Sequence, residues 1–80
     1  MKRNKLISAR KQLQMTQEEV AIKSGIQRSY YGLIENGLRN PTLHTAMKIA
    51  FALNVTIQDV FPEEIFFGNK CYELKQNQII

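Results

Sequence analysis

Residues 16–37, TQEEVAIKSGIQRSYYGLIENG, contain two segments of helix length separated by one glycine. Thr16 and Glu19 have the spacing of a capping box, in which the side chain of each residue accepts a hydrogen bond from the backbone N–H of the other. Gly25 can adopt the left-handed conformation that ends many helices. The segment is therefore predicted to form two short helices that meet at a tight turn, at about 17–24 and 27–36.

Two further segments place apolar side chains at intervals of three and four residues, which is the spacing of one helix face. They span residues 4–13 and 43–53, where Asn4 and Thr42 are candidate N-terminal caps. The apolar stripe expected on the second of these helices consists of Leu43, Ala46, Met47, Ile49, Ala50 and Leu53.

A second capping box, formed by Thr56 and Asp59, predicts a short fifth helix that ends before Pro62. The links between the five predicted helices are short, which is typical of a compact all-α domain. Residues 1–61 are therefore expected to form one all-α domain, because eighty residues are too few to build a second core.

The remaining residues, 62–80, have a different pattern. The stretch EIFFGNKCYELKQ places Gly68 and Asn69 between two segments rich in apolar and aromatic residues, which is typical of a β-hairpin. A frayed tail is the alternative interpretation. Because an isolated two-stranded hairpin is marginally stable in water, this tail needs a surface to pack against or a second copy of itself.

Apolar side chains occupy consecutive positions in the tail, so one face of one strand cannot bury all of them. We therefore expect the tail to form a dimerisation arm between two copies of the chain, or to contact a partner protein. Cys71 is expected to be a buried thiol and not a redox switch. The candidate dimerisation residues are Ile65, Phe66, Phe67, Tyr72 and Leu74.

The formal charge of the chain is +4, and the basic surplus lies in the helical part. Residues 1–61 contain nine lysines and arginines against four acidic residues, whereas residues 62–80 contain two against three. A basic surplus on a small domain suggests a polyanionic partner, although solubility alone is a sufficient reason for such a charge.

Several classes of protein are disfavoured by what the chain contains. No apolar run approaches the roughly 20 residues that a membrane-spanning helix needs, and no apolar stretch of a secretory signal follows the N-terminal charges. The single cysteine cannot form an internal disulfide, so we expect a cytoplasmic protein. One cysteine and one histidine, His44, do not make a metal site, and no nucleophile–base pair stands out. We therefore expect no cofactor, no metal and no enzyme activity.

The second helix of the central pair has two chemically different faces. Its expected buried face carries Tyr31, Ile34 and Glu35. Amide, guanidinium and hydroxyl groups gather at the N-terminal end of the other face, and such groups can read base edges in the major groove. The candidate base-reading residues are Gln27, Arg28, Ser29, Gly32 and Leu33, where Gly32 can allow close approach to DNA and Leu33 either contacts a thymine methyl group or covers the core.

The pattern AR…TQEEVA…GI…YYGLIENG…NPTL…AMKIAFAL resembles the Cro/cI-type, Xre-like family of phage and bacterial repressors. The resemblance covers about residues 4–61, three-quarters of the chain. It implies a five-helix, lambda-repressor-like DNA-binding domain that usually acts as a dimer on a palindromic operator.

The resemblance also implies roles for individual residues. Arg10 and Glu35 match a partly buried salt bridge, and Gln17 matches a residue that contacts a phosphate or supports the reading helix. Gln27, Arg28 and Ser29 match base-reading positions, whereas Gly32 and Leu33 replace the polar residues usual there, and Gln27 replaces the usual Ser or Thr cap. Candidate phosphate contacts besides Gln17 are Asn36, Arg39, Asn40 and Tyr30, which alternatively lies on the protein surface.

We therefore expect a sequence-specific regulator of transcription that binds double-stranded DNA, with repression as the expected outcome. The alternative is a protein-binding module, such as an antitoxin whose tail covers its toxin.

Overall fold

The computed structural model describes residues 2–67 and 70–73. Within these residues, the predicted all-α fold with a C-terminal hairpin is confirmed. The helices are α1 (Asn4–Gln12), α2 (Gln17–Ser24), α3 (Arg28–Glu35), α4 (Leu43–Ala52) and α5 (Ile57–Val60), and the strands are β1 (Glu64–Phe67) and β2 (Lys70–Glu73).

Local hydrogen bonds start α2, α4 and α5 as their sequences predict. The hydroxyl of Thr16 accepts from the backbone N–H of Glu19 at 3.1 Å, and the Glu19 carboxylate accepts from the backbone N–H of Thr16 at 2.8 Å. Thr56 and Asp59 form the same reciprocal pair before α5. Gly25 ends α2 in the left-handed region, with φ of 72°.

The start of α1 is different from its prediction. Asn4 is the first helical residue and not the cap, because Arg3 occupies the cap position and provides no side-chain capping bond. The backbone N–H of Arg3 instead donates to the carbonyl of Glu35, at the end of α3. A tertiary contact, which no local pattern reveals, therefore accompanies the first turn of α1.

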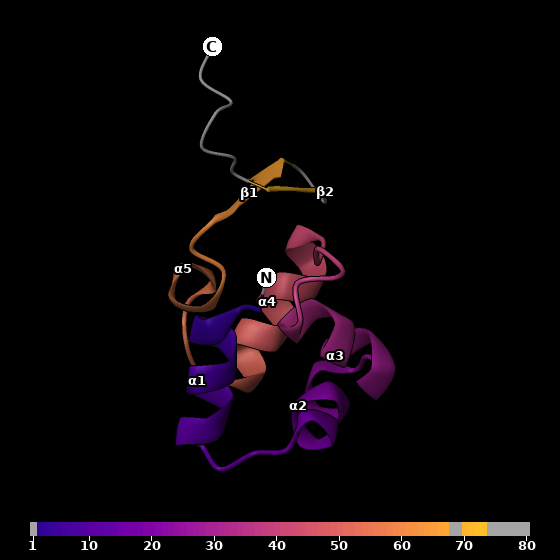
Figure 1. Ribbon diagram of the computed structural model, residues 1–80, viewed down its shortest axis with the longest axis vertical. Helices are drawn as coiled ribbons and strands as arrows, with labels where there is room; N and C mark the ends of the chain where they lie inside the picture. Colours follow the sequence, from indigo (N-terminus) through magenta and orange to yellow (C-terminus); the bar gives the residue numbers. More distant parts are fainter. Residues whose placement is uncertain (1, 68–69, 74–80) are drawn as a thin grey trace.

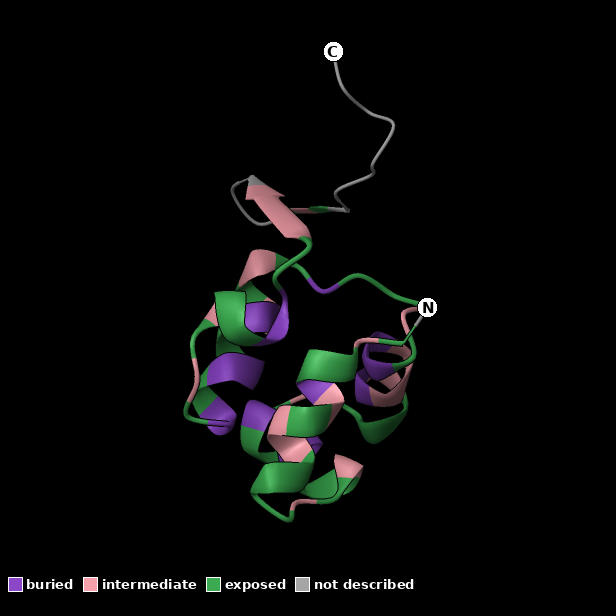
Figure 2. Cartoon of the chain, turned by 60° about the vertical axis from the view of Figure 1, so that its left-hand side comes forward, coloured by how far each residue is buried: buried purple, intermediate pink, exposed green. Residues whose placement is uncertain are grey.

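Side chains from all five helices build the core. Helix α4 lies in the middle, with α1 and α5 on one side and α2 and α3 on the other (Figure 1). The buried surfaces of the helices face one another across this centre (Figure 2). The core cluster consists of Leu6, Val20, Ala21, Tyr31, Ile34, Ala46, Ile49, Ala50, Leu53, Val60 and Phe61.

One part of the apolar stripe predicted on α4 lies outside the core. Ala46, Ile49 and Ala50 are buried, but the Met47 side chain is 52% exposed. Phe51, one turn further along, is 88% exposed. The helix buries one face only, and these two side chains stand beside that face because positions four apart share a direction.

The C-terminal hairpin is antiparallel, with Ile65 opposite Tyr72 and Phe66 opposite Cys71. Phe66 packs against the core. Cys71 was expected to be buried, but it is only half-buried. The Cys71 thiol donates a hydrogen bond to the Glu64 carboxylate at 2.7 Å. The hairpin prediction is therefore confirmed for the strands, whereas Gly68 and Asn69, expected in the turn, and Leu74 lie outside the described residues.

The described helices include none that is both long enough and apolar enough to cross a membrane.

Candidate nucleic-acid interface

The outward face of α3 and the residue before it carry polar groups to the surface. Gln27, Arg28 and Ser29 are exposed, and Gly32 and Leu33 are half-buried. Gln27 is the cap residue of α3, and its side chain makes no capping bond, as expected for a glutamine at this position. The amide of Gln27 and the guanidinium of Arg28 therefore stand at the open N-terminal end of the helix.

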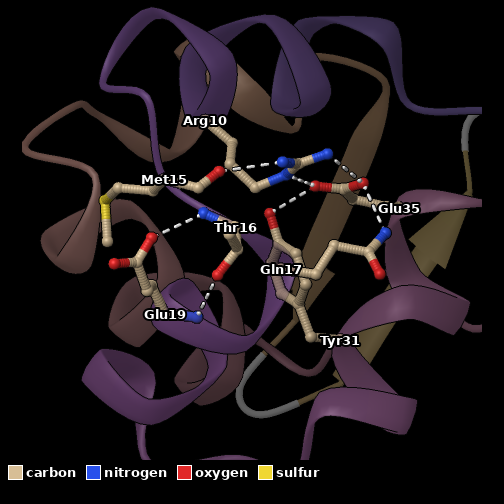
Figure 3. A network of polar contacts seen from close by, with 7 residues as sticks. All are labelled: Arg10, Met15, Thr16, Gln17, Glu19, Tyr31 and Glu35. Atoms are coloured by element: carbon tan, nitrogen blue, oxygen red, sulfur yellow. Dashed lines mark hydrogen bonds and ion pairs between the residues drawn. The ribbon is translucent and has the colours of Figure 1, made fainter.

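The opposite face of α3 is buried and anchored by Glu35, whose side chain is 2% exposed. The carboxylate accepts from Arg10 Nε at 2.6 Å and from the Tyr31 hydroxyl at 2.7 Å. It also accepts from Gln17 Nε2 at 3.0 Å (Figure 3). Because Arg10 also donates to the Met15 carbonyl at 2.9 Å, this one carboxylate links α1, the α1–α2 connection, α2 and α3.

The charge states of this network follow from its surroundings. Burial raises the pKa of Glu35, but hydrogen bonds from Arg10, Gln17 and Tyr31 more than offset this effect, so the pKa lies below its ordinary value. Burial, and then the hydrogen bond to Glu35, raise the pKa of Tyr31. The hydrogen bond to Glu35 raises the pKa of Arg10. Glu35 therefore remains a charged acceptor and Tyr31 a donor, which keeps the orientation of α3 relative to α1 and α2.

Gln17 begins α2 and lies against the outward part of α3. Its amide nitrogen donates to Glu35, and its amide oxygen lies near Gly32, since a Cβ atom added at Gly32 would come 3.6 Å from that oxygen. The structure thus shows a contact from Gln17 to α3. A phosphate contact by the other N–H of this amide remains a proposal.

The connection between α3 and α4 carries the remaining candidate contacts. Asn36, Arg39 and Asn40 are exposed, and the backbone N–H groups of Leu38 and Arg39 both donate to the Leu33 carbonyl, at 2.9 and 3.3 Å. The Asn40 side-chain oxygen accepts from the Arg3 guanidinium at 2.7 Å. Tyr30, the other candidate, is partly buried against the core.

Arg3 is the residue at this site that sequence reasoning missed. It precedes the first helix, where periodicity makes no prediction, and its contacts reach residues 31 to 37 positions away. Its basic character was the one signal available.

Among the described residues, no three His, Cys, Asp or Glu side chains are grouped in a way that could hold a metal ion.

Comparisons with known proteins agree with this arrangement. The helix-turn-helix family model matches residues 6–60, which include most of α1 and all of α2 to α5. The chain is 44% identical over 62 residues to the uncharacterised HTH-type transcriptional regulator YqaF of Bacillus subtilis, and the match covers 78% of this chain and 74% of that protein.

Solved structures give the same result for the fold. The restriction-modification controller protein C.AhdI from Aeromonas hydrophila is 36% identical, with a TM-score of 0.70 over 72% of this chain and 88% of that one. The biofilm regulator SinR, solved in complex with DNA, is 27% identical, with a TM-score of 0.68 over 72% of this chain and 97% of that one.

Proposed function

The chain belongs to the helix-turn-helix family of DNA-binding transcriptional regulators, and from this premise we propose that it represses transcription by binding a palindromic operator as a homodimer. The observation that carries the proposal is the division of α3 into two faces. Glu35 and its partners hold one face inside the domain, while the exposed Gln27, Arg28 and Ser29 occupy the other. A rigid helix with polar groups at its N-terminal end suits the major groove.

Within this proposal Arg28 is the principal base-reading residue, since a guanidinium can donate two hydrogen bonds to the O6 and N7 acceptors of guanine. Gln27 and Ser29 contact neighbouring bases. Gly32 lets the helix backbone come close to the DNA, and Leu33 contacts a thymine methyl group with the part of its side chain that is exposed.

The phosphate contacts lie on both sides of this reading surface. Gln17 and the free N–H groups at the start of α2 face one strand, because the N-terminal end of a helix favours an anion. The connection after α3 supplies the others. Such contacts set the register of the protein on the duplex and carry no sequence preference. The proposed residues are Gln17, Tyr30, Asn36, Arg39 and Asn40.

The proposed homodimer forms through the outward face of the hairpin. Ile65 and Tyr72 are paired across the two strands, and Tyr72 is 49% exposed. Phe66 was expected in the same contact, but successive residues of a strand point to opposite faces, and Phe66 packs against the core. We accordingly divide the chain into a DNA-binding part, 1–61, and a dimerisation arm, 62–80.

A regulator of transcription acts on the chromosome, so we place the protein in the cytoplasm.

The test is enrichment of random duplex DNA by the purified protein near physiological salt. We expect an inverted repeat with half-site centres about 10 base pairs, or a multiple of one helical turn, apart. Replacing Arg28 with alanine should relax the preference at one symmetric pair of positions, a loss of about 1–3 kcal/mol of discrimination.

The control is Lys23→Ala, which removes the same charge from an exposed residue at the end of α2. It should lower affinity slightly and leave base preference unchanged. Binding without an enriched sequence and with a steep salt dependence would contradict the proposal, because only phosphates would then be recognised.

A second candidate function is the binding of a different protein through the hairpin, as in an antitoxin. It is favoured by the same apolar pair, Ile65 and Tyr72, on a two-stranded sheet that is marginal without a partner. The oligomeric state distinguishes the two candidates. A chain that binds a different protein should be monomeric when purified, whereas the proposed repressor should be a dimer.

A further inference from the structure

Arg3 contacts the last turn of α3 from outside that helix. Its Nε donates to the Ile34 carbonyl at 2.8 Å, and its backbone N–H donates to the Glu35 carbonyl at 2.8 Å. The last carbonyls of a helix have no partner within the helix. Arg3 therefore supplies a donor to the Glu35 carbonyl, although it lies more than 30 positions away in the sequence. At the Ile34 carbonyl it adds a second donor, because the backbone N–H of Gly37 also donates there at 3.1 Å.

The same guanidinium reaches the connection that follows α3. Its Nη2 atom donates to the Asn40 side-chain oxygen at 2.7 Å and to the Arg39 carbonyl at 3.2 Å. Arg39 and Asn40 are two of the proposed phosphate contacts. Because the five N–H donors of arginine are arranged in a rigid plane, one side chain can fix the end of α3 and this loop relative to each other.

The third group of Arg3 contacts belongs to the C-terminal part of the chain. Arg3 Nη1 pairs with the carboxylate of Glu64, at the start of β1, and the guanidinium lies 5.6 Å from the centre of the Phe61 ring. The Glu64 side chain is 1% exposed, and its other oxygen accepts from the Cys71 thiol of β2. Glu64, the first residue of β1, thus links Arg3 to Cys71 of β2.

We propose that Arg3 is a positioning residue for DNA binding that couples the phosphate-contacting loop, residues 36–40, to the docked hairpin through Glu64. The proposal rests on the proposed function, because it assigns a role to residues of the same interface. A carboxylate buried this deeply needs a cationic partner. Docking of the hairpin therefore favours the one placement of Arg3 in which it also holds Arg39 and Asn40.

This coupling acts in both directions. If the docked hairpin favours the DNA-binding arrangement of the loop, then bound DNA favours the docked hairpin by the same factor. A partner that lifts β1 from the domain would release Glu64 from Arg3 and weaken phosphate contacts without touching the reading helix. The hairpin is in this way a control element for affinity and not for sequence preference.

The first experiment measures hydrogen exchange of backbone amides in the free protein, comparing Glu64→Gln with Glu63→Gln. Glu63 is the exposed neighbour, so it is a matched control for the loss of one negative charge. We expect Glu64→Gln to accelerate exchange at Leu38 and Arg39 by roughly fivefold or more, relative to the amides of α2, and Glu63→Gln to change neither.

Equal acceleration throughout the chain would overturn the proposal, since it would report a general loss of stability. Unchanged exchange at Leu38 and Arg39 would overturn it as well. Because no DNA is present, this measurement decides whether Glu64 and the loop are coupled even if the proposed function fails.

The second experiment measures DNA affinity over a range of salt concentrations. Arg3→Ala should weaken binding roughly tenfold and reduce the salt slope by about one, with the ranking of operator sequences unchanged. Lys2→Ala removes the same charge from the exposed neighbouring residue and should weaken binding less than about threefold. Arg3→Lys keeps the charge without the planar donors and should fall between the two, which provides a folded variant if Arg3→Ala is unstable.

The double variant of Arg3 and Arg39 identifies how Arg3 acts. If Arg3 works through the loop, Arg3→Ala combined with Arg39→Ala should weaken binding by less than the product of the single effects. Independent, multiplicative effects would overturn the proposal, as would equal losses in Arg3→Ala and Lys2→Ala. Wild-type protein that binds no DNA would refute the proposed function and would leave the exchange result to decide the coupling.

Discussion

Glu35 is a charged side chain near the centre of a small helical domain. Its carboxylate is stable there because three neighbours, Arg10, Gln17 and Tyr31, donate hydrogen bonds to it. Removing one partner of such a buried pair leaves the other without compensation, and the loss is commonly about 3–5 kcal/mol. Glu35 therefore anchors α3 to α1 and α2, and its replacement should destabilise the domain.

The lowered pKa of Glu35 predicts acid sensitivity. Because the pKa is lower in the folded than in the unfolded state, the stabilisation is fully present above the unfolded pKa, about 4.3, and is lost as pH falls through the folded pKa. In urea titrations from pH 7 downward, the free energy of unfolding should fall once the pH drops below the unfolded pKa of Glu35 and should continue to fall through its folded pKa. Glu35→Gln should be less stable at pH 7 but should decline less steeply in acid.

The control for this prediction is Glu18→Gln, at an exposed position on α2. It should retain the decline of the wild-type protein. If Glu35→Gln loses stability in acid as steeply as the wild type, the pKa of Glu35 does not contribute to the acid sensitivity.

Substitution of Gly32 is expected to change stability and DNA affinity in opposite directions. Alanine has room at this position, since its Cβ would meet only the Gln17 amide oxygen, at 3.6 Å. Gly32→Ala should raise the free energy of unfolding by about 0.5–1 kcal/mol, because alanine favours a helix more than glycine does. It should also weaken operator binding, measured by fluorescence anisotropy, because in the proposed complex the added methyl group lies where the helix backbone approaches the DNA.

Gly25→Ala is the contrasting variant. Its φ of 72° is unfavourable for alanine, so this change should lower stability by about 1–2 kcal/mol while affinity of the folded protein stays the same. Unchanged operator binding in Gly32→Ala would mean that α3 does not approach DNA closely at this position.

At the scale of the elements, α2 and α3 show two different ways of starting a helix. Helix α2 has a complete capping box, whereas α3 begins at a glutamine whose side chain makes no capping bond. The short α2 depends on this local bonding, because isolated helices of its length are marginal in water. For α3, tertiary contacts through Tyr31, Ile34 and Glu35 replace the missing cap.

Removing the cap of α2 should therefore lower the stability of the whole domain. Thr16→Ala is expected to reduce the free energy of unfolding by about 1 kcal/mol, since the N–H of Glu19 loses its acceptor. Thr16→Ser keeps the hydroxyl and should restore most of this loss in thermal or urea unfolding. Equal stability of the two variants would show that the hydroxyl does not stabilise the helix.

At the scale of the whole molecule, we compare two apolar surfaces, both within the part of the chain that the structure describes, as candidates for the dimer contact. One is the outward hairpin face, with Ile65 and Tyr72, and the other is the side of α4 that exposes Met47 and Phe51. The proposed dimer uses the hairpin, because an isolated two-stranded sheet needs a surface to pack against. Helix α4 has such a surface already, since its buried face packs in the core of the domain.

Sedimentation equilibrium should distinguish these surfaces. Tyr72→Glu is expected to convert the dimer to a monomer, because it places a charge in the centre of the apolar contact. Phe51→Glu, at an even more exposed aromatic residue, should leave the dimer intact. The opposite outcome would move the dimer contact to α4.

Local chemistry made most of the fold predictable. Capping boxes, helix-ending glycines and apolar periodicity act between residues one to four positions apart, so the five helices and the buried face of α3 could be identified from the sequence. The pairing of Arg10 with Glu35 followed from a family resemblance, and the chemistry of an arginine on an apolar helix face supported it.

What the sequence by itself determined is therefore the set of helices and the buried face of α3, because these depend on neighbouring residues. Only the tertiary structure decided that Met47 lies outside the core, that Gln17 completes the Glu35 network, and that Arg3 joins α3, its following loop and the hairpin. Arg3 and Asn40 are 37 positions apart, and Arg3 and Glu64 are further apart still. Contacts of this kind depend on how the helices pack together, so no local pattern encodes them.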